Sequence, residues 1–298
     1  MNRVLINLPY TASAVPPPVA RRLELSPEEW QLEHWRLIDP HLGELVREAA
    51  CFERRKVKID RPVIVYPLSP LVADPWGLWA AELADGPEAA GAGRPAVLPR
   101  TTAGRALVWP EKDVELILGR SVVPFHQEIT AAALRLLEES PLVLVVTLRS
   151  YGTMPLPFEK SRKYPRPQAA VGSQPGLTPD GLAELAGSIL RSCRWWPELN
   201  WPQAEGACLP EELAGNPRVR ALGLSLCRGL YLDERTGRRK GSAQGVVRVL
   251  RTFLGLLDQE MDRVARLRLD RSLAPKFKKS APIPSPVIKA ARLKGRTE

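Results

Sequence analysis

The stretch LVLVVTLRSYGTMPLPFE, residues 142–159, decides the predicted fold. It begins with five consecutive apolar residues and ends in a loop of Gly and Pro. A short apolar run that is rich in Val and closed by turn residues is typical of a fully buried strand in an α/β sheet. Since ligands of such sheets bind just beyond the carboxyl ends of the strands, we expect Arg149, Ser150 and Tyr151 at the mouth of any pocket. The competing interpretation is that Arg149 only marks where a buried strand reaches the surface.

Strands and helices alternate on both sides of this stretch. RVLINL (residues 3–8) predicts a first buried strand and VRALGLSL (219–226) a later one, whereas Pro62 places the strand-like run 57–67 at a sheet edge or a bulge. Apolar residues at helical spacing predict helices over 28–35, 40–50, 111–119, 129–139, 179–193 and 241–269. This alternation predicts one α/β domain, a three-layer α/β/α fold of phosphorylase/hydrolase-like type with a central mixed, mostly parallel sheet.

Two of these helices have capping signals at their start. Ser26, Pro27 and Glu29 have the spacing of a capping box with proline at the first helical position. Thr178 is the predicted N-cap of the helix that begins at Pro179.

The positive charge of the chain is concentrated at its end. The net charge is +10, and residues 272–298 contain seven Lys and Arg residues against Glu298 alone, with four interleaved prolines. We therefore divide the chain into a globular domain, 1–271, and a basic, Pro-rich, extended tail, 272–298. Such a tail can bind nucleic acid, an acidic partner or an anionic membrane surface, or it can merely aid solubility.

Targeting and cysteine signals are sparse. No apolar run is long enough for a membrane span, and the first residues lack an apolar signal segment, so the expected location is cytoplasmic. The four cysteines have no CxxC spacing, which favours buried, reduced thiols over a zinc site or disulfides: Cys51, Cys193, Cys208 and Cys227.

The residues alone do not identify a class of enzyme. The three histidines, His34, His41 and His126, form no HxH or HExxH motif. His126 stands just before a predicted helix, which is more often a packing position than a catalytic one. Ser150 is not in a GxSxG motif, and no phosphate-binding glycine loop follows a strand.

Several segments, in order, resemble the N-formylglutamate amidohydrolase family, whose fold is related to that of the zinc carboxypeptidases. The resemblance extends from the first strand to Glu234 and rests on the shared order of short matches. RVLINLPYTASAVPP is similar to the family's opening strand and its "PHSG…IP" loop, VIVYPLSPLVADP to "SRLVVDLNR…DP", PFH to "PYH", VVTLRSYGTMP to "IDLHSMP", AVG to the end of the "VLGT" strand, Asn200 and Pro202 to an "N-x-P" turn, and ALGLSLCRGLYLDE to "ALQLELRRSLYMDE".

The departures from this pattern fall on the positions to which the resemblance assigns zinc and catalysis. The two histidine positions, implied metal ligands, match Tyr10 and Arg149, and the glutamate implied as general base matches Ser225. The polar positions of the "DLNR" segment match Val65, Pro67 and Leu68. A catalytic zinc usually needs three protein ligands, and a permanently charged Arg cannot be one of them.

We therefore interpret the chain as a degenerate member, a non-enzymatic binding, scaffold or regulatory protein with no cofactor. A protein partner or a small anionic ligand would use the former pocket, and a carboxylate or phosphate would suit the Arg149 guanidinium. In the alternative, Asp39 or Glu159 neutralises the charge of Arg149, and this residue binds no ligand. The candidates for the lining of the former pocket are Tyr10, Asp39, His126, Arg149, Ser150, Asn200 and Ser225.

Two other functions stay open. In the first, the chain is a metal-dependent amidohydrolase that acts on N-acylated acidic amino acids and draws different zinc ligands from Asp39, His41 and His126. In the second, the basic tail is the functional part and binds nucleic acid or an acidic protein, with strong salt dependence.

Overall fold

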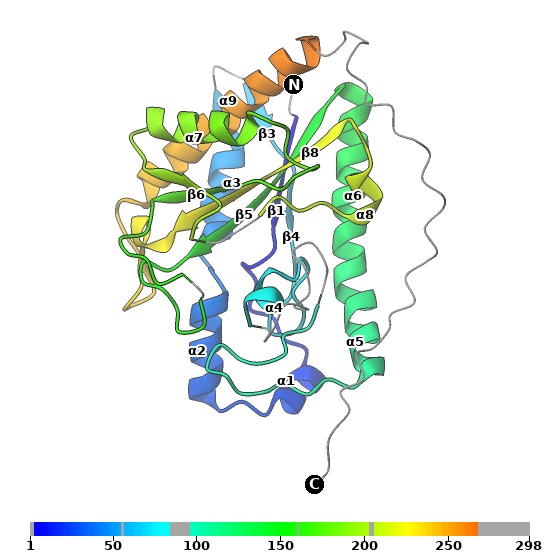
Figure 1. Cartoon of the computed structure of the whole chain (residues 1–298), viewed down its shortest axis with the longest axis vertical. Coiled ribbons are helices and arrows are strands. Elements are labelled where there is room, and N and C mark those ends of the chain that lie inside the picture. The colour runs from blue at the N-terminus through cyan, green and yellow to red at the C-terminus, as the bar shows by residue number, and fades with distance from the viewer. Residues whose placement is uncertain (1–2, 55–56, 84–95, 160, 203–205, 268–298) are drawn as a thin grey trace.

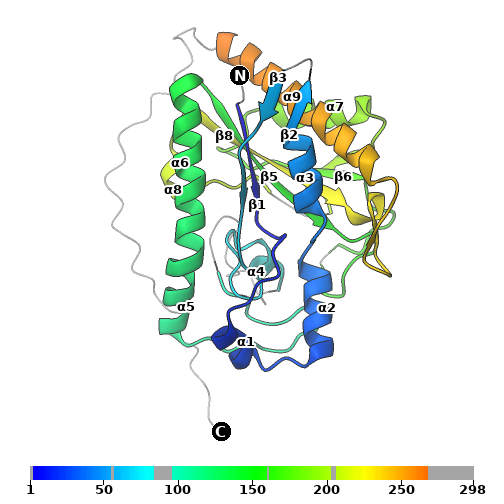
Figure 2. The ribbon, with the colours of Figure 1, turned by 180° about the vertical axis from the view of Figure 1, so that it is seen from behind.

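A computed structural model describes residues 3–54, 57–83, 96–159, 161–202 and 206–267. Its centre is a six-stranded sheet in the order β4-β1-β5-β8-β6-β7 (Figures 1 and 2). Strands β4, β1, β5 and β8 are parallel, β6 is antiparallel to β8, and β7 is parallel to β6. The bounds are β1 Val4–Leu8, β4 Val63–Val65, β5 Val143–Tyr151, β6 Ala169–Gly172, β7 Pro197–Leu199 and β8 Val219–Cys227. The predicted mixed, mostly parallel sheet is confirmed.

Strand β5 is the central strand that the sequence predicts, and all of its residues are buried. It pairs with β1 on one side and with β8 on the other, so that Val145 lies beside both Leu5 and Ala221. Successive side chains of a strand point to opposite faces of the sheet. Its apolar residues therefore contribute to two separate cores, with Leu144 in one and Val145 in the other.

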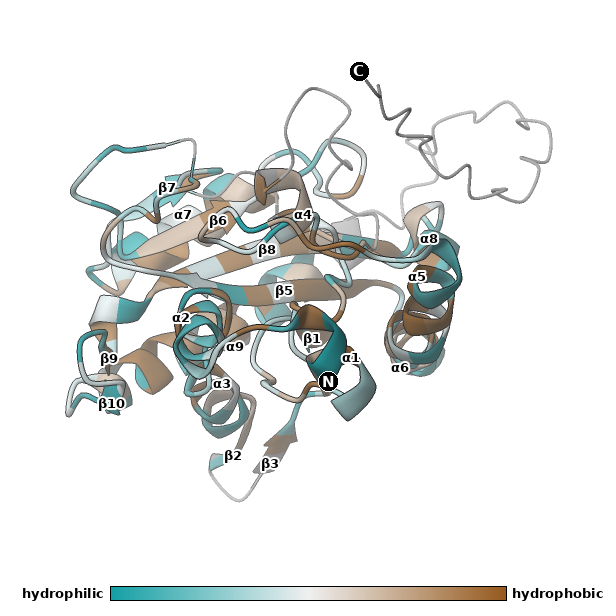
Figure 3. Cartoon of the chain, turned by 90° about the horizontal axis from the view of Figure 1, so that it is seen from below, coloured by the Kyte–Doolittle hydropathy of each residue, from teal (hydrophilic) through white to brown (hydrophobic). Residues whose placement is uncertain are grey.

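Helices cover both faces of the sheet, as a three-layer fold requires. One face packs against α3 (Leu42–Ala50), α7 (Leu182–Ser192) and α9 (Ala243–Leu267), and we call it the α9 face. The other packs against α6 (Val123–Glu139) and short helices, and we call it the α6 face. The short helices are α1 Pro17–Leu23, α2 Pro27–Leu37, α4 Leu78–Leu83 and α8 Glu211–Ala214. In Figure 3 the hydrophobic colour is concentrated on the central strands, and the hydrophilic colour lies mostly on outer helices and loops.

The two helices predicted around residue 120 form one continuous helical rod. Helix α5 (Glu111–Ile117) passes through a π-helical turn (Leu118–Val122) directly into α6. Pro124 lacks the N–H that a regular helix would use here, and the wider π-helical turn precedes it. His126 therefore lies within α6, and the prediction that it precedes a helix is wrong.

The two capping predictions had different outcomes. The capping box of α2 is confirmed, since the Glu29 N–H donates to Ser26 Oγ at 3.2 Å and the Ser26 N–H donates to Glu29 Oε2 at 2.7 Å. Thr178 is not the cap of α7, which begins at Leu182 after Gly181. Its hydroxyl instead donates to the Ala221 carbonyl at 2.9 Å, a tertiary contact that local spacing does not reveal.

The strand-like run 57–67 divides at Pro62. Strand β3 (Val57–Asp60) forms a hairpin with β2 (Cys51–Arg54), and β4 is an edge strand of the main sheet, as the proline indicates. A second small hairpin joins β9 (Leu232–Asp233) to β10 (Arg238–Arg239) after the 3-10 turn Arg228–Leu230.

The predicted basic tail, 272–298, lies outside the described residues. Among the helices that are described, none combines the length and the apolar character needed to cross a membrane.

Candidate functional site

Polar side chains gather on the α6 face at the carboxyl ends of the central strands. Ile6, Val146, Leu148 and Leu224 belong to the core of the α9 face. Because side chains alternate along a strand, the polar residues between these positions point toward the α6 face. They are Asn7, Thr147, Arg149 and Ser225, and all are buried. Together with Tyr10, Asp74, Trp76 and Trp79 from the adjoining loops they form what we call the buried polar site.

Arg149 lies beside Ser225 in the pairing of β5 with β8. Its Nε donates to Ser225 Oγ at 3.0 Å, and the residue is only 5% exposed. The backbone of Gly206 lies against the guanidinium, since a Cβ on Gly206 would be 3.6 Å from Arg149 Nη2. Glu159, an acid predicted to neutralise Arg149, instead forms an ion pair with Arg166. The guanidinium is thus enclosed by β8 and the Gly206 backbone.

Tyr10 and Asp74 form the second part of the buried polar site. The Tyr10 hydroxyl donates to Asp74 Oδ1 at 2.7 Å, and Asp74 also accepts from the N–H groups of Trp76 (3.2 Å), Trp79 (2.7 Å) and Ala80 (3.0 Å). Asp74 therefore caps the first turn of α4. Burial raises the pKa of Asp74, and the hydrogen bond from Tyr10 opposes this shift. Burial and the nearby Asp74 carboxyl raise the pKa of Tyr10, while the charge of Arg149 acts in the opposite direction.

Asn7 connects the strands to the loop that carries Asp74. Asn7 Nδ2 donates to Thr147 Oγ1 at 2.9 Å, and the Trp76 indole N–H donates to Asn7 Oδ1 at 3.2 Å. The Trp76 ring stacks on His126, with 4.3 Å between ring centroids. His126 Nε2 lies 3.0 Å from the Pro75 carbonyl oxygen, and burial lowers the pKa of this imidazole. His126 is thus a packed, hydrogen-bonded residue at the border of the site.

The segment 206–210, which we call the cover segment, closes the site over the sheet. A Cβ on Gly223 would lie 2.6 Å from the carbonyl carbon of Gly206, and a Cβ on Gly172 would lie 2.8 Å from its nitrogen. The backbone of Gly206 can lie this close to the sheet only because Gly172 and Gly223 have no Cβ. Ala207, Cys208 and Leu209 follow and are buried in the core of the α6 face.

Asp39 and Ser150 lie in a different cluster from Arg149, although all three were predicted to line one pocket. Ser150 follows Arg149 directly and so points to the opposite face of the sheet, where it accepts from Arg228 Nε at 2.9 Å. Asp39 accepts from the Tyr231 hydroxyl and, at 3.0 Å, from the Leu42 N–H at the start of α3. This Asp39 cluster joins α3 to the turn after β8.

Asn200 lies in neither cluster. It has a left-handed backbone conformation, with φ of 51°, just after β7. Its Oδ1 accepts from the Ser173 N–H at 2.8 Å, and its Nδ2 donates to Ser173 Oγ at 3.1 Å. The side chain therefore ties together the ends of β6 and β7.

The residues of the buried polar site do not fit a catalytic zinc. The positions that resemble the family's ligands and base hold a phenol bound to Asp74, a guanidinium and an alcohol. The alternative ligands do not lie together either. His41 Nε2 contacts the Gly237 carbonyl, His126 Nε2 contacts the Pro75 carbonyl, and Asp39 lies in the Asp39 cluster. Throughout the part of the chain that is described, no three His, Cys, Asp or Glu residues are grouped so that they could hold a metal ion.

Sequence reasoning missed Asn7, Asp74, Thr147 and the cover segment. A signal was present for Asn7 and Thr147, since each is a polar residue with apolar neighbours on both sides in a buried strand, and such residues need a buried partner. Asp74 and the cover segment are placed by loops, where no periodic pattern exists.

Comparison with known proteins agrees with this architecture. The family model for N-formylglutamate amidohydrolase (FGase) matches residues 2–232. The crystal structure of N-formylglutamate amidohydrolase from Ralstonia eutropha JMP134 is similar with a TM-score of 0.67 and 17% identity, over 88% of this chain and 95% of that one. A gene product from Agrobacterium tumefaciens has a TM-score of 0.55 and 15% identity, over 90% and 92% of the two chains. At these identities the two structures show the fold alone. No curated protein matches the sequence. The extent of the family match shows that this chain belongs to the N-formylglutamate amidohydrolase family.

Proposed function

We propose that this chain is a non-catalytic member of its family, a binding or scaffold protein that does not carry out zinc-dependent hydrolysis. The observation that carries the proposal is the hydrogen bond between Arg149 and Ser225 beneath the cover segment. These two residues stand where the family pattern has a histidine and a glutamate. A guanidinium stays protonated under physiological conditions and repels a metal cation.

The remaining chemistry of the site supports the same proposal. A serine hydroxyl cannot replace a carboxylate as general base, because its proton affinity as a neutral alcohol is far too low. The Tyr10 hydroxyl donates to Asp74, and burial keeps the pKa of this phenol above its ordinary value, so that a phenolate ligand is disfavoured. Each of these groups is buried and turned toward another part of the chain.

In this proposal the former catalytic residues hold the fold together. The Tyr10–Asp74 hydrogen bond joins the loop after β1 to the loop of Asp74, the Arg149–Ser225 hydrogen bond joins β5 to β8, and the Gly206 backbone lies against the Arg149 guanidinium. A partner would then bind the outer loops and helices of a rigid scaffold, since the carboxyl ends of the strands are closed by the chain itself.

The test is metal content together with activity. The full chain is purified without chelators after expression with added zinc, then analysed for zinc and for glutamate release from N-formyl-L-glutamate. We expect far less than one zinc per chain and no glutamate release above the buffer rate. About one zinc per chain with glutamate release at a rate proportional to protein concentration would overturn the proposal and support the amidohydrolase alternative.

A reconstruction provides the matched control. The triple substitution Tyr10→His/Arg149→His/Ser225→Glu restores the two histidines and the glutamate of the family pattern, and Asp39→Asn/His41→Gln removes two of the alternative ligands. If only the first variant binds zinc, the result supports the proposal that the zinc site was lost through changes at Tyr10, Arg149 and Ser225. Zinc in the unaltered chain that disappears in the second variant would show that the metal site lies at Asp39 and His41.

A further inference from the structure

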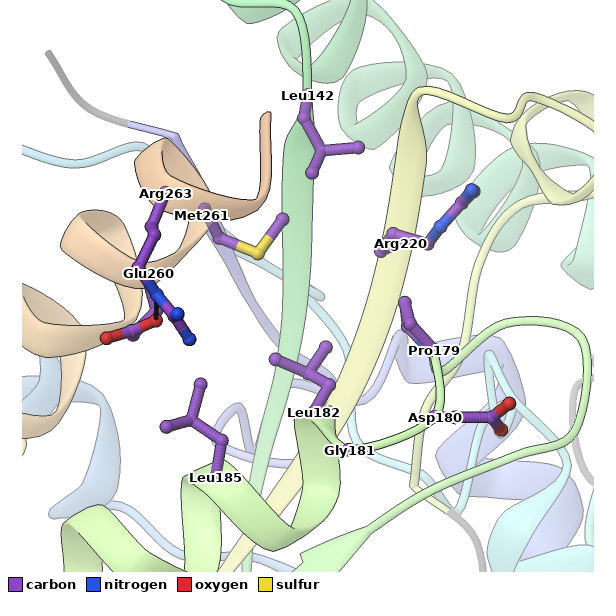
Figure 4. A pocket seen from close by; sticks show the side chains of 10 residues that line it. All are labelled: Leu142, Pro179, Asp180, Gly181, Leu182, Leu185, Arg220, Glu260, Met261 and Arg263. Atoms are coloured by element: carbon purple, nitrogen blue, oxygen red, sulfur yellow. Dashed lines mark hydrogen bonds and ion pairs between the residues drawn. The ribbon is translucent and has the colours of Figure 1, made fainter. Parts of the chain in front are cut away.

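A cavity of about 240 Å³ opens at the opposite end of the same strands. It lies at the amino ends of β5 and β8, between the start of α7 and the last turns of α9 (Figure 4). Its apolar floor consists of Leu142, Pro179, Leu182, Leu185 and Met261. We call it the α7–α9 groove, and it takes no part in the proposed function.

Charged side chains border the α7–α9 groove on two sides. Asp180 and Arg220 lie on one side of the floor, and Glu260 and Arg263 on the other (Figure 4). Arg263 Nε donates to Glu260 Oε2 at 2.7 Å, and Arg220 Nη1 donates to the Val219 carbonyl at 2.8 Å. The two acids and two bases balance, so the border does not repel a segment with basic flanks.

Gly181 lines the groove at the start of α7 and has no side chain. Its φ is +78°, and no atom lies within 4 Å of the point where a Cβ would stand. An apolar segment can therefore approach the floor directly over the start of α7.

We propose that residues 281–288 of this same chain, APIPSPVI, dock in the α7–α9 groove. Ile283, Val287 and Ile288 are aliphatic side chains that match the apolar floor, and prolines stand at positions 282, 284 and 286. Prolines restrict the unbound chain, which lowers the entropic cost of docking. Lysines stand before and after the segment, and Asp180 and Glu260 are the acids at the border that would face them.

The position of the groove favours a segment of this chain over a separate molecule. Met261 and Arg263 belong to the last two turns of α9, which ends at Leu267, and the chain continues from there. The intervening residues 268–280 could span on the order of 40 Å if fully extended, at about 3.3 Å per residue. Such a short tether gives an effective concentration in the millimolar range, so a weak contact suffices.

The test compares two variants of the full chain by methyl NMR of Leu182, Leu185 and Met261. The first is Ile283→Asp/Val287→Asp/Ile288→Asp, which places charges in the docking segment. The second, Leu273→Asp/Phe277→Asp/Leu293→Asp, adds the same charges elsewhere in the tail and serves as the control. We expect the three methyl resonances to move in the first variant and to stay at their original positions in the control.

A synthetic peptide of residues 280–291 tests the contact directly. Added to the first variant, it should return the resonances to their original positions in a saturable manner, and a scrambled peptide should not. Leu185→Asp, introduced into that variant, should weaken the peptide's affinity by about tenfold or more because a charge would be buried against it. A second control, Leu199→Asp, changes an exposed leucine of β7 outside the groove and should leave the affinity unchanged.

Two results would overturn the proposal. Identical resonances in the unaltered chain and the first variant would show that the segment does not occupy the groove. Resonances that move with protein concentration, together with a doubled mass in solution, would show that a second copy of the chain occupies it. Both results are independent of zinc content and of hydrolysis, so they leave the proposed function untouched.

Discussion

The buried polar site and the α7–α9 groove lie at opposite ends of the same strands, and they differ in both polarity and access. The carboxyl ends of β5 and β8 carry polar residues that are closed off by the chain, whereas the amino ends border an apolar cavity that is open. In an α/β sheet, ligands normally bind at the carboxyl ends. The comparison teaches that polar side chains at the expected place do not make a site unless the backbone leaves room above them.

The difference originates in the backbone as much as in the side chains. At the carboxyl end, Gly172, Gly206 and Gly223 allow two stretches of main chain to touch. At the amino end, Gly181 faces open space. Glycines thus allow close packing at one end of the sheet, whereas Gly181 borders open space at the other, and substitutions at the two ends should have different consequences.

The largest effect is expected for Gly223→Ala. Its Cβ would lie 2.6 Å from the Gly206 carbonyl carbon, so the cover segment must move away from the sheet. We expect a loss of about 3 kcal/mol or more in the free energy of unfolding, measured by urea denaturation. Gly255→Ala is the control: it lies within α9 with no atom near its Cβ position, and should add up to about 1 kcal/mol of stability. Equal stability of Gly223→Ala and the unaltered chain would mean that the cover segment is not closed.

Asp74→Asn should have the next largest effect. The amide cannot accept the four hydrogen bonds that Asp74 accepts, and we expect a cost of about 2 to 4 kcal/mol. Asp180→Asn at the border of the groove should change stability by less than about 0.5 kcal/mol. A comparable loss of unfolding free energy in both variants would contradict the proposed difference between the two ends of the sheet.

The cost of Asp74→Asn should also depend on pH. Because burial raises the folded-state pKa of Asp74, the stability that it contributes is fully present below its unfolded pKa and is lost as pH rises through its folded pKa. The deficit of the variant should therefore be largest near pH 3.5 and should shrink toward neutral pH. Urea denaturation of both proteins across this range measures it, and a deficit that grows with pH would contradict the burial-raised pKa.

The smallest effect is expected for Leu185→Ala. Leu185 is partly buried beside an open cavity, so removal of its side chain should cost about 1 kcal/mol or less. Leu224→Ala in the middle of β8 should cost about 2 to 5 kcal/mol, since Leu224 is fully buried. Thermal unfolding of the two variants measures the contrast, and a loss for Leu185→Ala as large as that for Leu224→Ala would contradict the difference between the two ends of the sheet.

The sequence by itself determined the class of the fold and the family. Strands β1, β5 and β8 are short segments rich in buried apolar residues, and the capping box at Ser26 is local chemistry, so short-range patterns suffice to predict them. The order of motifs also predicts that Tyr10, Arg149 and Ser225 occupy the positions of the family's site residues, and this assignment stays a prediction.

Only the tertiary structure decided which of the candidates meet. Tyr10 reaches Asp74 across 64 residues and Arg149 reaches Ser225 across 76, and no local period encodes such contacts. Because successive side chains of β5 point to opposite faces of the sheet, Ser150 lies on the other face from Arg149, beside Arg228 and the Asp39 cluster. The close approach of the cover segment depends on Gly172 and Gly223, which are distant in the sequence, because their lack of side chains matters only once the strands are assembled.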